Sequence, residues 1–296
     1  MRLADFPALL NEGFRALELN PKEYIAAIEA RAEVVFTEYS PGQRICWRRF
    51  GEGEPIVLLH GGHGSWLHWI RNVEALSKLY TLWIADMPGF GDSDSPSGKV
   101  GVPEVAAIVD SSIGSLIGAE APFDLAGFSF GGMIATQIAA SHANVRRLAI
   151  VGVAGHGGER RQPKSMIQWR GLSVDAEAAA LRHNLEALML TSRAADDELA
   201  LEVHRICCYK TRFRSHPLSL RAPLSALLDK LSIPVHFIWG SEDVTVFPEI
   251  VGPKLVGAHQ ERKLTIVPGV GHWTQFEAPQ EIDRTLVHWF SDTSPS

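Results

Sequence analysis

Ser129 is the residue whose setting most clearly indicates chemistry. It is the centre of Gly127-Phe128-Ser129-Phe130-Gly131, between an apolar run (123–129) and a stretch of small residues, GGMIATQIAA. A tight strand-to-helix turn needs glycine on both sides of the serine, and it raises the hydroxyl above the sheet. This context favours a nucleophilic serine over a glycine-rich helix start with an incidental capping serine.

His272 is the candidate base. A serine hydroxyl is a poor nucleophile unless a base takes its proton. Of the twelve histidines, His272 follows an apolar run (263–268) through Gly269 and Gly271. His236 is expected to be a core residue within a strand, and four others lack such a turn and are expected at the surface: His156, His183, His204 and His216.

Asp243 is the candidate carboxylate that orients this base. It ends the run VHFIWGSED and lies between Ser129 and His272 in the chain. The order Ser, Asp, His is the one expected of a nucleophile at a strand–turn–helix elbow. Glu242 is the neighbouring alternative, and we prefer Asp243 because only one of the two can point inward from the turn.

A glycine-rich segment, His60-Gly61-Gly62-His63-Gly64, follows another apolar run. Backbone N–H groups approach a substrate oxygen closely only where side chains are absent. We expect the Phe130 and Gly62 N–H groups to form an oxyanion hole, with His63 as the alternative second donor. His60 is expected to bond locally and hold the loop.

The acidic segment Asp86–Asp94 has the glycine and proline spacing of a structural turn. Its acids could suggest a site for Mg²⁺ or Ca²⁺, but a structural turn fits the spacing better, given the ligand sets that those ions demand. We therefore expect no metal and no other cofactor.

Short apolar runs and helical stretches alternate along most of the chain, which predicts a mostly parallel, doubly wound α/β sheet. Residues 33–50 indicate a hairpin around Ser40-Pro41-Gly42. The remaining strands and the helices between them are expected at these positions: strands 55–61, 80–89, 123–129, 145–155, 235–243 and 263–272, and helices 66–79, 103–119, 130–143, 246–259 and 276–291.

The alternation breaks between strands 145–155 and 235–243. Residues 156–232 are rich in Arg and His and predict helices at 174–189 and 196–214, so we expect a helical cap over the strand ends, where ligands bind in such sheets. The predicted organisation is a helical leader (1–32) interrupted at Asn20-Pro21, a core (33–155 and 233–296), and this cap.

Composition limits the classes of partner. The formal charge is −6 at pH 7, which argues against a nucleic-acid partner. No apolar run reaches the ~18 residues of a membrane span, and three cysteines, two of them adjacent, make a poor disulfide framework. We expect a cytoplasmic protein with a small-molecule substrate and no membrane association, and leave open whether it forms a homodimer.

Together LLHGG, DMPGFGDSD, GFSFGG, GSED and GHWTQFEAP resemble the α/β-hydrolase superfamily in order and context. The resemblance covers roughly 50–155 and 232–291 and implies the α/β-hydrolase fold. Within it, the HGG loop and Gly271-His272-Trp273 are most similar to the serine hydrolases that cleave a C–C bond in ring meta-cleavage products. Dehalogenases and epoxide hydrolases are excluded because they have Asp at the position of Ser129.

The resemblance implies a 2-hydroxy-6-oxo-dienoate-like substrate, with Trp273 lining its site and His63 near it. A cap arginine would hold the carboxylate, and the candidates are Arg205, Arg212 and Arg214. A carboxylesterase or lactonase would use the same triad, and a non-catalytic receptor could share the fold.

Overall fold

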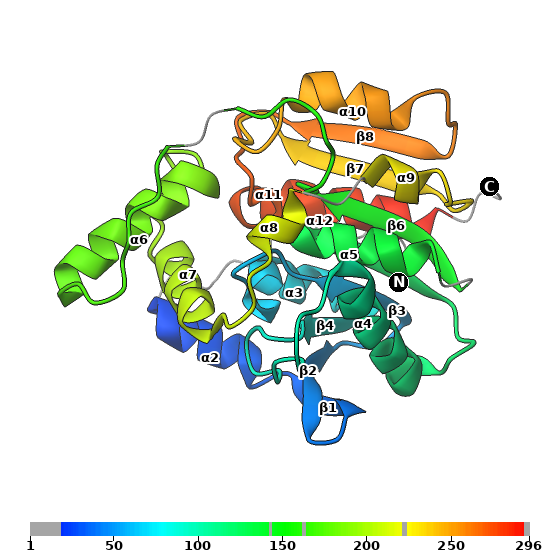
Figure 1. Ribbon diagram of the computed structural model, residues 1–296, viewed down its shortest axis with the longest axis horizontal. Coiled ribbons are helices and arrows are strands. Elements are labelled where there is room, and N and C mark those ends of the chain that lie inside the picture. The colour runs from blue at the N-terminus through cyan, green and yellow to red at the C-terminus, as the bar shows by residue number, and fades with distance from the viewer. Residues whose placement is uncertain (1–18, 142–143, 162–163, 221–223, 293–296) are drawn as a thin grey trace.

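The computed structural model describes residues 19–141, 144–161, 164–220 and 224–292. These form one eight-stranded sheet in the order β1-β2-β4-β3-β5-β6-β7-β8 (Figure 1). The strands are β1 (Glu33–Ser40), β2 (Gln43–Phe50), β3 (Glu54–Leu59), β4 (Tyr80–Asp86), β5 (Phe123–Phe128), β6 (Val145–Val151), β7 (Val235–Gly240) and β8 (Arg262–Val267).

The sheet is antiparallel at one edge and parallel elsewhere. β1 and β2 form the predicted hairpin, with Phe36 opposite Cys46, and β2 runs antiparallel to β4. From β4 onward the neighbouring pairs β4–β3, β3–β5, β5–β6, β6–β7 and β7–β8 are all parallel. The predicted α/β-hydrolase fold with a mostly parallel sheet is confirmed.

Helices cover both faces of the sheet because its central strands are apolar on both. In β3, Ile56 and Leu58 face one core cluster, while Val57 and Leu59 face the other, as the two-residue period of a strand requires. The first cluster packs against η3 (Trp66–Trp69), α3 (Ile70–Leu76), α11 (Thr274–Glu277) and α12 (Pro279–Ser291). The second packs against α4 (Val102–Ile117), α5 (Phe130–Ala139) and α10 (Pro248–Val256).

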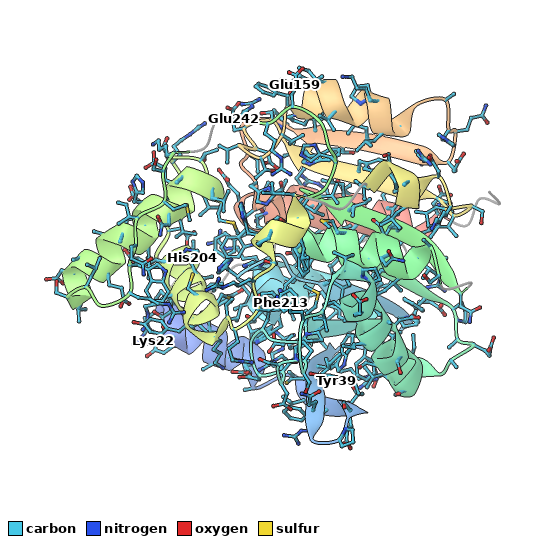
Figure 2. All side chains as sticks on the ribbon, in the orientation of Figure 1. Lys22, Tyr39, Glu159, His204, Phe213 and Glu242 are labelled. Atoms are coloured by element: carbon cyan, nitrogen blue, oxygen red, sulfur yellow. The ribbon has the colours of Figure 1, made fainter. Side chains whose placement is uncertain are left out.

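The segment between β6 and β7 is helical, as expected. It contains α6 (Val174–Leu188) and α7 (Glu198–Lys210), which stand to one side of the sheet in Figure 1, and two short helices that the sequence pattern did not reveal, α8 (His216–Ser219) and α9 (Leu224–Leu228). Phe213, between α7 and α8, packs against Phe90 and Phe130 of the core (Figure 2). This aromatic contact ties the insertion to the core.

The predicted leader is described only in part. Asn20 caps α2 (Pro21–Glu29), its side chain accepting hydrogen bonds from the N–H groups of Lys22 and Glu23. The predicted break at Asn20-Pro21 is therefore the start of a helix, and residues 5–18 of the prediction lie outside the described residues. Of the helices in the described part of the chain, none has the length and apolar character needed to span a membrane.

Candidate active site

The turn between β5 and α5 holds Ser129 in a strained conformation. Its φ and ψ are 51° and −112°, in a region that residues with a side chain rarely adopt. A Cβ on Gly127 would lie 2.4 Å from the carbonyl oxygen of Gly131, and one on Gly131 would lie 2.4 Å from that of His60. Both glycines are thus required by close backbone packing, and Ser129 remains partly accessible while its neighbours are buried.

His272 and Asp243 converge on this serine from the ends of two other strands. His272 follows β8 and its Nε2 lies 3.0 Å from Ser129 Oγ. Its Nδ1 lies 2.8 Å from Asp243 Oδ2, in the turn after β7. The second oxygen of Asp243 accepts hydrogen bonds from the Thr245 N–H at 2.8 Å and hydroxyl at 2.7 Å. The carboxylate is wholly buried, so its acceptor directions are fixed.

Glu242, the alternative carboxylate, points elsewhere. Its side chain is exposed and lies 3.4 Å from Arg161. The turn after β7 therefore directs Asp243 inward and Glu242 outward, which is the arrangement preferred from the sequence.

The loop after β3 lies against the serine. His60 Nδ1 donates to the Gly61 carbonyl at 2.7 Å, and its Nε2 accepts from the Met87 N–H at 2.9 Å. Burial lowers the pKa of His60 to about 4, so the ring stays neutral and keeps its acceptor. His68 also holds the loop, because its Nδ1 accepts from the Gly61 N–H at 3.2 Å.

Phe130 and Gly62, the residues expected to supply the oxyanion donors, both border the cavity beside Ser129. Phe130 is the first residue of α5, where an N–H has no acceptor within its helix. Gly62 lines the same cavity as Phe130 and Ser129, and a Cβ on it would lie 2.5 Å from Ser215 Oγ. A side chain at this position would therefore have to displace the Ser215 hydroxyl.

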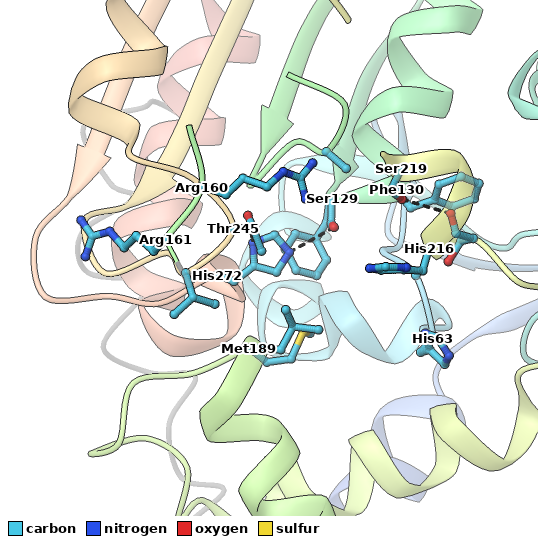
Figure 3. Close-up of a pocket in the computed structure, with 16 residues that line it drawn as sticks. His63, Ser129, Phe130, Arg160, Arg161, Met189, His216, Ser219, Thr245 and His272 are labelled. Carbon is cyan, nitrogen blue, oxygen red and sulfur yellow. Dashed lines mark hydrogen bonds between the residues drawn. The ribbon is translucent and has the colours of Figure 1, made fainter. Parts of the chain in front are cut away.

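A cavity of about 170 Å³ opens beside Ser129. Ligand pockets usually measure about 300–1,000 Å³, so this one suits a small molecule. Its charged and ionisable lining consists of Arg160, Arg161, His63, His216 and His272 (Figure 3). Among the described residues, no Asp or Glu lines it.

Arg160 and Arg161 differ in their partners. Arg161 donates to the Ser241 carbonyl at 2.7 Å and lies 3.8 Å from Glu249. Arg160 points toward Ser129 (Figure 3), and no hydrogen bond or ion pair joins it to the described residues. Partial burial lowers its pKa, against the opposing charge of Asp243. Arg160 is therefore a cation available to a ligand.

Three of the predicted substrate contacts lie away from this cavity. Trp273 is buried, donates to the His68 carbonyl at 2.9 Å and stacks on Phe276. Arg205 pairs with Glu202 on its own helix at 2.8 Å. The guanidinium of Arg212 donates to the carbonyls of Lys210, Gly91 and Ser93 and ties the insertion to the turn after β4.

Arg214, the third arginine considered, is likewise outside the lining, whereas His63 belongs to it. Sequence reasoning missed Arg160, Arg161 and His216. The position of the two arginines could have indicated their role. They lie a few residues past β6, where the chain leaves the carboxyl edge of the sheet.

The acidic turn after β4 is held by protein groups. The Asp86 carboxylate pairs with Arg48 at 2.8 Å and accepts from the N–H groups of Trp66 and Asp92. A Cβ on Gly91 would lie 2.2 Å from this carboxylate. Asp86, Asp92 and Cys46 lie close enough to share an ion, but the Arg48 guanidinium donates a hydrogen bond to each of the three.

Comparison with known proteins shows the family to which the chain belongs. The chain matches the Alpha/beta hydrolase family over residues 56–285, and it belongs to that family: it is a hydrolase. It is 26% identical over 263 residues to 2-hydroxy-6-oxo-6-phenylhexa-2,4-dienoate hydrolase of Comamonas testosteroni, covering 82% of this chain and 90% of that one. It is 28% identical over 242 residues to 2-hydroxymuconate semialdehyde hydrolase of Pseudomonas sp. (strain CF600), covering 77% and 83%.

Solved structures share the fold. An esterase from Rhodococcus sp. ECU1013 superposes with a TM-score of 0.75 at 21% identity, covering 88% of this chain and 99% of that one. The enol-lactonase from Burkholderia xenovorans LB400 gives 0.71 at 21% identity, covering 87% and 100%.

Proposed function

We propose that the protein is a serine hydrolase in which Ser129 is the nucleophile, His272 the base and Asp243 the residue that orients the base. The hydrogen-bonded chain from Ser129 Oγ to His272 Nε2 (3.0 Å) and from Nδ1 to Asp243 (2.8 Å) carries this proposal. Asp243 holds the proton of His272 on Nδ1, which leaves Nε2 free to accept from the serine. The Phe130 and Gly62 N–H groups would then stabilise the oxyanion.

The substrate that we favour is a 2-hydroxy-6-oxo-dienoate-like acid, cleaved at a C–C bond. The two hydrolases compared above support this class by their names, and Arg160 supports an acid because it is a cation without a protein partner in the described chain. In this assignment Arg160 holds the carboxylate in place of the arginines expected from the sequence. Segment 156–232 is the cap that closes the site.

The reaction would proceed in two stages. His272 first helps to move the enol proton to carbon, which gives a keto form able to act as the leaving group. Attack by Ser129, or by a water that it activates, on the distant carbonyl then forms a tetrahedral oxyanion. Collapse of this species breaks the C–C bond and releases the 2-hydroxydienoate. Attack by water gives the carboxylic acid directly, whereas attack by Ser129 leaves an acyl-enzyme that water then hydrolyses to the acid.

The proposal is tested by turnover of 2-hydroxy-6-oxo-6-phenylhexa-2,4-dienoate, measured as the loss of the dienolate absorbance. Wild type should consume it, and Ser129→Ala should lower kcat at least about 10³-fold. Ser141→Ala is the matched control, because Ser141 bonds to Gln137 at the far end of the same helix. Arg160→Gln should raise KM with a smaller effect on kcat. Consumption at an unchanged rate by Ser129→Ala would exclude the proposed nucleophile.

A carboxylesterase or lactonase is the second candidate, favoured by the esterase and enol-lactonase structures. Here Ser129 would form an acyl-enzyme that water hydrolyses. Turnover of p-nitrophenyl acetate and small lactones without turnover of the dienoate would favour this alternative. Absence of all three activities in folded protein would indicate a binding protein instead.

A further inference from the structure

Ser215 precedes a short helix of the insertion but does not cap it. It is the N-cap residue of α8, a position where a serine side chain normally accepts a hydrogen bond from a backbone N–H of the first turn. Here its φ and ψ are −74° and −30°, which are helical values, and its side chain makes no such bond. The residue is only 2% exposed. No hydrogen bond joins its hydroxyl to any other group in the described part of the chain.

A buried hydroxyl without a partner is unfavourable, because it has lost its bonds to water and gained none in return. Such groups are few in native proteins, and each has a specific reason to be there. Ser215 borders the cavity beside Ser129. A ligand bound in this cavity can therefore supply the missing partner.

The Ser215 hydroxyl lies against Gly62. A Cβ on Gly62 would be 2.5 Å from Ser215 Oγ, and standard bond lengths and angles put such a Cβ about 2.5 Å from its own backbone nitrogen. Ser215 Oγ is therefore within about 5 Å of the Gly62 nitrogen. Hydrogen bonds to an oxygen measure about 2.5–3.2 Å, so one oxygen atom can lie within reach of both groups. Phe130, the other proposed donor, has its Cβ 4.0 Å from the same point.

Contacts with the core fix the position of Ser215. Phe213, two residues before it, packs against Phe90 and Phe130, with ring centroids 5.5 and 6.0 Å apart. The Ser215 carbonyl accepts hydrogen bonds from the Ser219 N–H at 3.0 Å and hydroxyl at 3.2 Å. Figure 3 shows Ser219 on the same side of Ser129 as Phe130. A donor held in this way is preorganised, which is what makes an oxyanion donor effective.

We propose that the Ser215 hydroxyl is a third donor of the oxyanion hole, and so a catalytic residue supplied by the insertion. It would donate to the oxygen that becomes negatively charged when the substrate carbonyl is attacked, beside the N–H groups of Phe130 and Gly62. The inference rests on the proposed function, because an oxyanion forms only if Ser129, or a water that it activates, attacks a carbonyl. It applies equally to a C–C bond, an ester and a lactone, since all three pass through a tetrahedral oxyanion.

Ser215→Ala should slow the chemical step without weakening substrate binding. Removal of one oxyanion donor lowers kcat about 10²–10³-fold, so kcat should fall about 10²-fold while KM stays within about threefold of wild type. The melting temperature should stay equal or rise, because alanine removes an unpartnered hydroxyl and no capping bond. A serine with a structural role would show the opposite pattern, with a lower melting temperature.

Inhibition by trifluoroacetophenone and by acetophenone separates the transition state from the ground state. The trifluoromethyl ketone adds to a reactive serine and forms a tetrahedral oxyanion, whereas acetophenone binds as the intact ketone. Ser215→Ala should weaken inhibition by trifluoroacetophenone about 10²-fold and change inhibition by acetophenone by less than about threefold. Ser225→Ala is the matched control, because Ser225 is an exposed serine of α9 in the same insertion. It should resemble wild type in kcat, in melting temperature and in both inhibition constants.

The inference would be overturned by a loss of kcat smaller than about threefold in Ser215→Ala, or by a melting temperature well below that of wild type. An equal loss of inhibition by both ketones would also overturn it, since the hydroxyl would then bind the ground-state substrate. Each of these results leaves the proposed function intact, provided that wild type turns over substrate and is labelled at Ser129 by a fluorophosphonate. Wild-type protein that shows neither turnover nor labelling would overturn the proposed function and the inference together.

Discussion

Replacing Asp243 by Asn should reverse the tautomer of His272. The Thr245 N–H and hydroxyl both donate to Asp243 Oδ1, so the amide oxygen of Asn takes that position and its NH₂ group faces His272. An NH₂ group can only donate a hydrogen bond, so the Nδ1 atom of His272 would have to accept it and could not carry a proton. The proton of the neutral ring would then lie on Nε2, which could no longer accept from Ser129.

The size of the effect follows from this change. Loss of the accepting tautomer in a Ser-His-Asp arrangement lowers kcat about 10⁴-fold, equivalent to about 5 kcal/mol of transition-state stabilisation. The fold should persist, because the amide fills the same volume and retains both bonds from Thr245. The kinetic loss should therefore not be accompanied by a large loss of thermal stability.

Stopped-time assays with p-nitrophenyl acetate, together with circular dichroism melting, would measure both quantities. Glu242→Gln is the matched control: Glu242 is adjacent but exposed and pairs with Arg161, so kcat should stay within about threefold of wild type, as for a surface ion pair. A loss of kcat of about 10⁴-fold is expected for Asp243→Asn. The reasoning would be refuted if this variant kept more than about a tenth of the wild-type kcat.

Three further changes test the packing and burial that hold the site. Gly131→Ala places a Cβ 2.4 Å from a backbone oxygen and should lower the free energy of unfolding, measured by urea titration, by about 3 kcal/mol. In the control Gly114→Ala the nearest atom lies 3.7 Å from the new Cβ, so the free energy of unfolding should stay equal or rise slightly. Arg48→Met leaves the buried Asp86 carboxylate without its ion-pair partner and should lower the free energy of unfolding by about 3–5 kcal/mol. Arg49→Met should lower it by less than about 1 kcal/mol, because its ion pair is exposed. Burial lowers the pKa of His236 to about 4, so only the unfolded chain takes up its proton between pH 6.5 and 4. Over that range wild type should lose about 1.4 kcal/mol per pH unit more than His236→Gln, and parallel stability curves would contradict this.

Motifs with strict local geometry could be predicted from the sequence. Gly127 and Gly131 mark the elbow because a Cβ at either would collide with backbone, and such a requirement is visible in the residue types alone. The apolar runs predicted the strands for a similar reason, since strands buried on both faces must be apolar throughout. His60 also lies where expected, bonding its own loop.

The substrate side of the site could not be predicted in the same way. The sequence does not distinguish Arg160 from Arg205 and Arg212. Only the fold shows that Arg205 and Arg212 bond to other groups of the protein. His216 was expected at the surface because it lacks the turn setting of His272, and it is exposed there while also lining the cavity. Whether such side chains face the cavity depends on how the insertion packs on the sheet, which local patterns do not encode.

Covalent labelling of Ser129 tests the central claim most directly. Wild-type protein treated with a fluorophosphonate probe should gain one adduct, which peptide mass spectrometry should place on Ser129. Ser129→Ala should gain none, and His272→Ala should react far more slowly, while Ser141→Ala should label like wild type. Absence of labelling in folded wild-type protein, or an adduct on another residue, would contradict the assignment of Ser129 as the nucleophile.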